Sequence, residues 1–290
     1  MATRIDGLSL VTGGWRSRHS ALRLSVDACR AALGRCELTP QDVGLLINAG
    51  LYRDGNLGEP ALAPLIQDDI GANPEDPHPG TAGTFSFDVA NGACGLLNAL
   101  EIADGFLRSR TVQTVLLVAS DASPSRRLAP EFPYLPGGAA AVCQWTADEV
   151  GIGPFKWHNA FDEGSTFRAT VGFEGGRNVL HIVEEADFAE RAAEAAVAAA
   201  VELLEDNHLA PEDIDLIVAS PALPSFAKRV ASELAKPEEA VVTDPGPWHT
   251  VGLFAALARV QRAGRLRSGT NALLLCAAAG VNAGAALYRA

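Results

Sequence analysis

The sequence predicts an α/β protein built from two copies of one unit, because two pairs of segments repeat in the same order. Residues 38–47, LTPQDVGLLI, are similar to residues 209–218, LAPEDIDLIV, and residues 107–118, LRSRTVQTVLLV, are similar to residues 266–275, LRSGTNALLL. Each segment joins a helical stretch to a short apolar run, which indicates mainly parallel sheets covered by helices. A repeat of this length indicates two structural copies.

The first half shows its elements in the residue pattern. Residues 21–34 are alanine-rich with helical spacing, and the proline and apolar run of residues 38–47 predict a short helical turn and then a buried strand. Residues 85–89, FSFDV, alternate as a strand does, and residues 95–105 have the spacing of a helix. Residues 121–137 contain four prolines and are predicted to form a loop, a kind of segment that often shapes functional sites.

The second half repeats this order. An alanine-rich stretch at residues 188–207 predicts a helix, and a further helix is predicted from about residue 249. Residues 146–167 are rich in glycine and aromatic residues without a clear period, so we predict a connection there. The expected halves are therefore residues 1–150 and residues 151–290.

Composition narrows the possible functions. The chain has 290 residues, 48% of them hydrophobic, and a formal net charge of −12, which disfavours nucleic acid and anionic membranes as partners. It contains neither a signal-peptide layout nor an apolar run of about 18 residues that could span a bilayer. We therefore expect a cytoplasmic protein that binds neither nucleic acid nor membranes.

The cysteines and histidines do not form a metal pattern. The five cysteines, Cys29, Cys36, Cys94, Cys143 and Cys276, are odd in number and include no CxxC pair, and the histidines lack ligand spacing. This excludes a disulfide framework and a structural zinc site, so neither a metal nor a bound cofactor is expected. Taken without context, each cysteine is most often a small buried hydrophobe.

Cys94 differs from the others because it lies between a predicted strand and a predicted helix. At a helix N-terminus, the helix dipole and free N–H groups lower the pKa of a thiol. The small neighbours Gly92, Ala93 and Gly95 leave room for a substrate. A nucleophile in such a turn recurs in enzymes; the alternative is a buried cysteine in a packed turn.

The stretch 85–121 resembles the active-site region of β-ketoacyl-acyl-carrier-protein synthase III and its relatives. Those proteins carry Phe-Asp-Val, then Ala-x-Cys-x-Gly, and later a strand that ends in Ser-Asp. This chain has Phe87-Asp88-Val89, Ala93-Cys94-Gly95 and Ser120-Asp121. The C-terminal AAAGVNAGAALYRA also resembles the glycine-rich closing hairpin of that family. The resemblance implies the thiolase fold, a duplicated five-layered αβαβα architecture, with Cys94 as the acyl-accepting residue.

The same resemblance implies two partners for the cysteine, a His and an Asn. Ser220 stands where the His is expected, and His249 stands where the Asn is expected. His249 precedes the counterpart of the helix that follows Cys94, so the two helix heads are expected to face each other. A neutral imidazole there could take the thiol proton; the alternative is a capping or surface histidine. Ser220 either orients His249 or binds an oxyanion, or it is an ordinary hydroxyl at a strand end.

Main-chain groups complete the predicted site. N–H groups at Gly95, Ala279 and Gly280 are candidates for an oxyanion hole. Asp121 is predicted to tether a loop and not to act on the substrate.

Four basic residues in this acidic chain could meet a phosphopantetheine phosphate or an acidic carrier protein, or they are solvated surface. They are Arg126, Arg127, Lys228 and Arg229.

These features predict an acyltransferase that accepts an acyl group on Cys94 from an acyl-coenzyme A or acyl-carrier-protein thioester. Transfer to a nucleophilic acceptor ranks above malonyl-type condensation, within fatty-acid-like, polyketide or other secondary-metabolite biosynthesis. The alternative is a catalytically weak or inactive subunit of a heteromeric complex with a complete synthase III homologue. Both predict a dimer, homomeric or heteromeric, with strand 85–89 near the contact.

Overall fold

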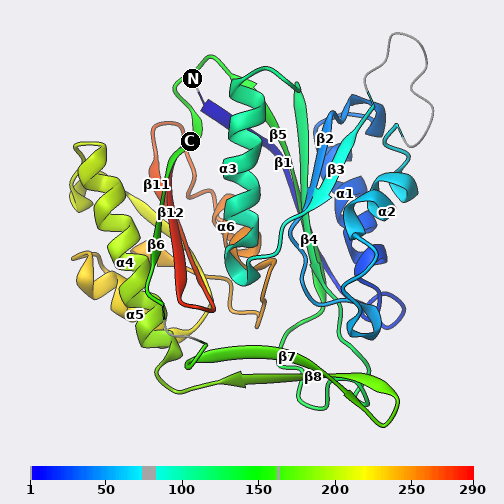
Figure 1. The fold of residues 1–290 in the computed structure, drawn as a ribbon. Helices are drawn as coiled ribbons and strands as arrows, with labels where there is room; N and C mark the ends of the chain where they lie inside the picture. Colours follow the sequence, from blue (N-terminus) through cyan, green and yellow to red (C-terminus); the bar gives the residue numbers. More distant parts are fainter. Residues whose placement is uncertain (1, 74–82, 162–163) are drawn as a thin grey trace.

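The protein is built on one mixed sheet and a separate hairpin, as seen in a computed structural model that describes residues 2–73, 83–161 and 164–290 (Figure 1). The strands of the large sheet are β1 (Ala2–Thr12), β2 (Leu45–Asn48), β3 (Phe85–Asp88), β4 (Thr114–Asp121), β5 (Gly137–Thr146), β6 (Gly151–Asn159), β9 (Leu216–Ser220), β10 (Val241–Val242), β11 (Asn271–Ala278) and β12 (Asn282–Arg289). The hairpin pairs β7 (Phe167–Glu174) with β8 (Arg177–Glu184). The helices are α1 (Ala21–Arg35), α2 (Leu62–Ile70), α3 (Gly95–Arg108), α4 (Phe188–Asp206), α5 (Pro224–Glu233) and α6 (Gly252–Arg262).

The strand order confirms the predicted duplication. From one edge it runs β3-β2-β4-β5-β1, and from the other edge it runs β10-β9-β11-β12-β6. Each half also has a short 3₁₀ turn at the place that the repeated proline segments predict. Pro40–Asp42 precedes β2 in the first half, and Pro211–Asp213 precedes β9 in the second. The division at residues 1–150 and 151–290 stays a prediction; β5 ends four residues before that point and β6 begins directly after it.

Five layers follow from this order, as Figure 1 shows. Helices α1 and α2 cover the outer face of the first half, α4 and α5 cover that of the second half, and α3 and α6 lie between the halves. Three apolar clusters fill the spaces between the layers. Leu46 represents the cluster under α1 and α2, Phe254 the cluster between the halves, and Phe226 the cluster under α4 and α5. The outer face of the second half is packed against the alanine-rich side of α4, whose small side chains bring the helix close to the sheet.

Two predictions about the sheet are wrong. The sheet is mixed and not mainly parallel, because β1, β5, β6 and β12 pair antiparallel in its middle. The segment predicted as a connection, 146–167, contains β6, which joins the two halves by pairing with β12 and β1. Gly151, Gly153 and Pro154 interrupt the apolar alternation of this strand, and they hide it from pattern analysis.

No helix in the described part of the chain is long and apolar enough to cross a membrane.

Candidate active site

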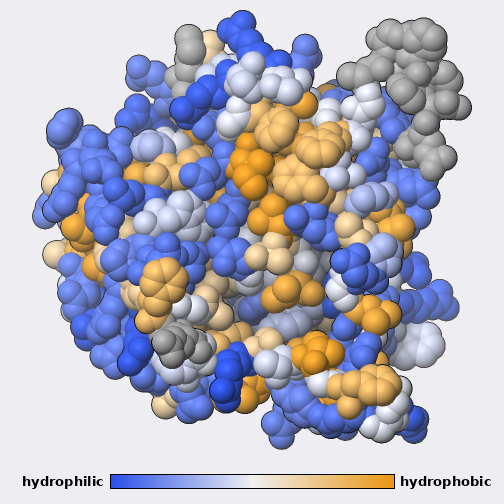
Figure 2. Space-filling view, in the orientation of Figure 1, coloured by the Kyte–Doolittle hydropathy of each residue, from blue (hydrophilic) through white to orange (hydrophobic). Residues whose placement is uncertain are grey.

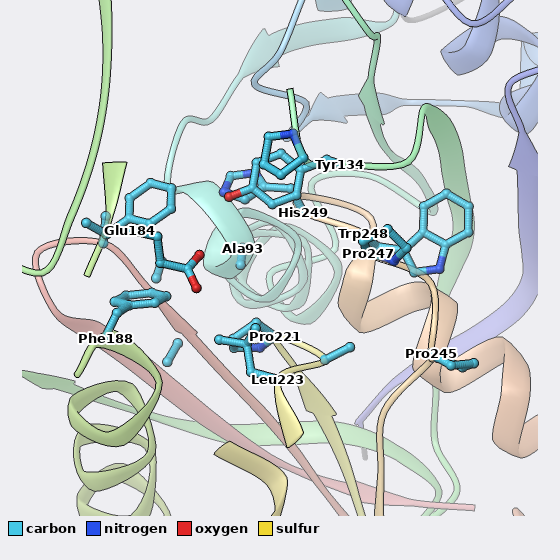
Figure 3. Close-up of a pocket in the computed structure, with 16 residues that line it drawn as sticks. Ala93, Tyr134, Glu184, Phe188, Pro221, Leu223, Pro245, Pro247, Trp248 and His249 are labelled. Carbon is cyan, nitrogen blue, oxygen red and sulfur yellow. The ribbon is translucent and has the colours of Figure 1, made fainter. Parts of the chain in front are cut away.

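A pocket of about 280 Å³ opens between the two halves (Figure 3). Loops before β5 and before α6 form one wall, the base of the β7–β8 hairpin and the start of α4 form another, and the ends of β9 and β11 lie below. Its lining is mostly apolar and consists of Ala93, Pro133, Tyr134, Phe167, Glu184, Phe188, Pro221, Ala222, Leu223, Pro245, Pro247, Trp248, His249, Ala277, Ala278 and Ala279. The proline-rich loop 121–137 is confirmed as a loop and contributes two of these residues, Pro133 and Tyr134.

The predicted strand–turn–helix around Cys94 is present, but Ala93 is the residue that faces the pocket. After β3, a 3₁₀ turn spans Gly92–Cys94, and α3 follows directly. Ala93 lines the pocket, whereas Cys94 is 0% exposed and its Sγ donates to the carbonyl oxygen of Asn282 at 3.5 Å. The thiol therefore points into the layer between the halves.

The expected lowering of the Cys94 pKa is wrong. Burial raises this pKa well above its ordinary value of 9.0, the neighbouring Cys276 thiol raises it further, and a backbone hydrogen bond near Gly284 opposes both. A helix terminus contributes about 0.3–1 kcal/mol to a nearby charge, which is less than the ~1.4 kcal/mol that changes a pKa by one. Burial can change a pKa by up to about 3–5, so it dominates and the thiol stays protonated.

His249 lies where the sequence predicts, against the head of α3. A Cβ placed on Gly92 would lie 3.6 Å from Cε1 and 3.8 Å from Nε2 of His249, which is ordinary van der Waals contact, so the imidazole lies directly against this turn. The φ of 47° at position 92 is what favours a glycine there. The imidazole is surrounded by the rings of Tyr134, Tyr52 and Phe167, with ring centroids at 4.6, 4.8 and 6.3 Å. Its Nδ1 is buried and has no hydrogen-bond partner among the described residues.

These surroundings keep His249 neutral near pH 7. Burial lowers its pKa from the ordinary value of 6.5, and the carboxylate of Asp121 opposes this effect. A neutral imidazole at a pocket wall can accept a proton from a substrate. His249 is thus a candidate general base at the pocket wall.

Asp121 tethers the loop that carries His249, as predicted. Its Oδ2 accepts hydrogen bonds from the backbone N–H and the hydroxyl of Thr250 at 2.7 and 2.9 Å, and its Oδ1 accepts one from the N–H of Tyr52 at 3.4 Å. Asp121 ends β4 in the first half, and Thr250 precedes α6 in the second. The pair therefore fixes His249 relative to the opposite half.

Ser220 lies at the end of β9, as predicted, but outside the pocket lining. The side chain is 1% exposed, and its Oγ has no hydrogen-bond partner in the described residues. It lies against the start of α6, where a Cβ on Gly252 would collide with Oγ. Its predicted role in orienting His249 or an oxyanion stays a prediction; the residues after it, from Pro221, form the pocket floor.

Of the three oxyanion candidates, one lies at the pocket. Ala279 lines it, whereas Gly95 and Gly280 do not. The N–H of Gly95 donates to the carbonyl oxygen of Gly92 within the turn, and a Cβ on Gly95 would lie 3.2 Å from Ala49. Gly95 is therefore explained by close packing, and the oxyanion roles of Ala279 and Gly280 stay predictions.

Several lining residues were missed by sequence reasoning. Glu184 ends β8 at the pocket mouth with its carboxylate directed inwards in Figure 3, and partial burial raises its pKa. Phe167 and Phe188 pack beside it in a tilted arrangement, with ring centroids 5.2 Å apart. A hairpin without a counterpart in the other half was the available signal, since the repeat does not account for residues 167–184.

The basic residues proposed for carrier docking differ in availability. Arg126, Arg127 and Lys228 are exposed, whereas Arg229 forms ion pairs with Glu190, Glu194 and Glu233 at 3.4, 3.5 and 3.0 Å. Arg229 is thus used to hold α5 against α4, and its predicted docking role is disfavoured. Nowhere in residues 2–73, 83–161 and 164–290 do three His, Cys, Asp or Glu side chains form a group that could hold a metal ion.

Comparison with known proteins agrees with this architecture. A family model described as 3-oxoacyl-[acyl-carrier-protein] synthase III C terminal matches residues 204–290. The β-ketoacyl-[acyl-carrier-protein] synthase III of Clostridium perfringens is 27% identical over 289 residues, covering 92% of this chain and 83% of the relative. The protein of the same name from Sphingopyxis alaskensis is 27% identical over 300 residues, covering 95% and 88%.

Solved structures share the fold. The 3-oxoacyl-[acyl-carrier-protein] synthase III of Aquifex aeolicus aligns with a TM-score of 0.82 at 19% identity, covering 99% of this chain and 100% of that one. Xanthomonas campestris OleA, solved with lauric acid and lauroyl-CoA, aligns with a TM-score of 0.81 at 18% identity, covering 100% and 99%. The strand order, the five layers and these matches lead to one conclusion: the chain is similar in sequence to the β-ketoacyl-acyl-carrier-protein synthases III and shares the fold of these thiolase-superfamily proteins.

Proposed function

We propose that this protein transfers an acyl group from a phosphopantetheine thioester to a nucleophilic acceptor in the pocket between its halves. The observation that carries the proposal is a neutral His249 in a mostly apolar pocket, where the heads of α3 and α6 meet. The related synthases act on acyl-carrier-protein substrates by their names, and OleA was solved with an acyl-CoA. The donor here would be an acyl-coenzyme A or an acyl carrier protein, with no bound cofactor.

The lining indicates the kind of acyl group. Phe167, Phe188 and Leu223 offer apolar surface, and the volume of about 280 Å³ is small. It lies just below the range of about 300–1,000 Å³ typical of small-molecule pockets. A short or medium acyl chain fits this description best.

Transfer to an alcohol, amine or thiol is favoured over carbon–carbon condensation. A decarboxylating condensation needs hydrogen-bond donors around the malonyl thioester carbonyl. Ser220 takes the place of the expected His, and its hydroxyl is buried outside the pocket. With that donor missing, His249 acting as base is the chemistry that the described residues support. Two routes fit this scheme, one through an acyl group on Cys94 and one without it.

One observation favours the alternative of a weakly active or inactive subunit. The side chain that faces the pocket at the head of α3 is Ala93, and the Cys94 thiol is buried and protonated. In this case a complete synthase III homologue would provide the activity of a heteromeric complex. Acyl transfer by the purified chain alone would support the acyltransferase, and its absence would support the subunit.

Apolar side chains gathered over α3 and β3 (Figure 2) support a dimer, homomeric or heteromeric. β3 is an edge strand of the sheet, and Phe85 on it is 58% exposed. Phe87 lies beside it with ring centroids 5.3 Å apart. An exposed edge strand flanked by apolar side chains is a natural contact for a second chain.

The experiment measures release of coenzyme A from a panel of acyl-coenzyme A donors in the presence of alcohol, amine and thiol acceptors. Ala279→Trp places bulk in the pocket, and we expect it to abolish release. Ala31→Trp, an equal change at an exposed site on α1, should keep the wild-type rate. If the wild-type protein releases no coenzyme A above the protein-free rate with any donor, the proposal fails. That result would support the alternative of a weakly active or inactive subunit.

A further inference from the structure

The pocket presents a methyl group at the head of α3, where a nucleophile would be expected. Ala93 lines the pocket, and the adjacent Gly92 lies against the imidazole of His249. The lining residues in the described part of the chain include no cysteine, serine, threonine or lysine. A thioester carbonyl placed beside Ala93 thus meets a general base but no thiol or aliphatic hydroxyl among the described lining residues. The hydroxyl of Tyr134 also lies in this lining, and burial raises its pKa, which disfavours the phenolate that could accept the acyl group.

Cys94 is not placed to serve instead. Its side chain is 0% exposed, and its Sγ is held by the carbonyl oxygen of Asn282 at 3.5 Å, next to the thiol of Cys276. Its own N–H donates to the carbonyl oxygen of Asn91 at 2.9 Å, which fixes the turn that directs Ala93 outwards. Bringing Sγ into the pocket would require turning the start of α3 and breaking both contacts.

The motif shows the same displacement. In the Ala-x-Cys-x-Gly pattern quoted above, one residue separates the cysteine from the glycine, whereas Cys94 directly precedes Gly95. Aligned on Gly95, the position of the cysteine falls on Ala93. Successive residues of a 3₁₀ turn point about 120° apart, so a shift of one residue is enough to remove the thiol from the pocket.

We propose that this protein transfers the acyl group directly from thioester to acceptor in a ternary complex, with His249 as the base and without an acyl-enzyme; this rests on the proposed function. The O–H or N–H of the acceptor gives its proton to a ring nitrogen of His249 while its lone pair bonds to the thioester carbonyl carbon. The tetrahedral oxyanion collapses, the C–S bond breaks, and the leaving pantetheine thiolate takes the proton from the imidazolium. Donor and acceptor are the only reactants, and His249 returns to its neutral form.

The test moves the thiol by one residue. Wild type, Cys94→Ala, Ala93→Cys and the double variant A93C/C94A are incubated with hexanoyl- or lauroyl-coenzyme A, and their intact masses are measured. In parallel, hydroxylamine serves as a probe acceptor, and hydroxamate is measured above the protein-free rate. Circular dichroism checks that each variant is folded.

We expect no acyl adduct on the wild type and wild-type hydroxamate formation by Cys94→Ala. Ala93→Cys should gain one acyl group per chain, and A93C/C94A should keep it, because the new thiol faces the base. An adduct on the wild type that maps to Cys94 would overturn direct transfer, as would loss of hydroxamate formation in folded Cys94→Ala. Failure of the proposed function gives a different result, in which no variant forms hydroxamate and Ala93→Cys stays unlabelled. That result would contradict both acyl transfer in this pocket and the direct mechanism.

Discussion

The aromatic rings around His249 determine its protonation. Tyr52, Tyr134 and Phe167 exclude water from the imidazole, so burial lowers its pKa below 6.5 against the opposing carboxylate of Asp121. The folded protein therefore binds fewer protons at this residue than the unfolded chain does, and its stability falls as the pH drops below 6.5. Activity that needs the neutral ring falls in the same direction.

The rate of transfer should therefore be flat above pH 6.5 and decline only at more acidic pH, below the ordinary histidine value. His249→Ala should slow transfer by about 10²–10⁴-fold, the loss expected for a positioned acid–base group. His158→Ala, which removes an imidazole bonded to Glu202 at 3.0 Å on β6, is the matched control and should keep the wild-type rate. The measurement is kcat/KM against pH; a rate that keeps rising above pH 8 would indicate instead that ionisation of the Cys94 thiol is limiting.

At this scale the sequence predicted the meeting of His249 and the head of α3 but not the side chain that faces it. The glycine at position 92 and the duplicated helices were visible in the pattern. The burial of Cys94 depends on Asn282 and Cys276, which come from β12 and β11, more than 180 residues away along the chain. Local spacing carries no information about such a contact.

At the scale of elements, regular helices and strands were predictable and the exceptions mark special roles. The repeated proline turns and the helices α3 and α6 follow directly from periodicity. Strand β6 was missed because its glycines and proline break the alternation, and the β7–β8 hairpin was missed because it has no repeat partner. Both elements have roles that the repeated unit does not supply. Strand β6 joins the two halves of the sheet, and the hairpin contributes Phe167 and Glu184 to the pocket.

The edge strand β3 should carry the dimer contact. Phe85→Asp would place a charge in a desolvated apolar contact, which is costly unless it is paired, so we expect this variant to be a monomer in light scattering. Phe173→Asp changes a phenylalanine that is 79% exposed on the β7–β8 hairpin, and it should stay dimeric. A wild-type protein that is a stable, active monomer at micromolar concentration would contradict the prediction.

For the whole molecule, the pocket exists only because two halves are held together. Their sheets meet through β1 and β6, and the apolar layer of α3 and α6 lies between them. The buried carboxylate of Asp121 adds a polar link across this layer, since it accepts two hydrogen bonds from Thr250. The duplication could be predicted from the sequence. Of the link, the sequence indicated only that Asp121 lies at a strand end and tethers a loop, and it did not identify Thr250 as the partner.

Asp121→Ala should weaken both the fold and the site. It leaves the buried N–H and hydroxyl of Thr250 without their acceptor, so the free energy of unfolding should fall by about 1–3 kcal/mol. Thr250→Val keeps the bond from the N–H and should cost about 0.5–1.5 kcal/mol, while Asp27→Ala at an exposed position of α1 should cost little. Denaturant unfolding measures these differences.

The pH profile separates positioning of His249 from a purely structural role. The carboxylate of Asp121 favours the protonated imidazole, so removing it lowers the pKa of His249 further. In Asp121→Ala the acid limb of kcat/KM should therefore move to lower pH, whereas Thr250→Val, which keeps the carboxylate, should leave the limb in place. An Asp121→Ala protein that is destabilised but has an unmoved acid limb would show that the carboxylate holds the halves together without acting on His249.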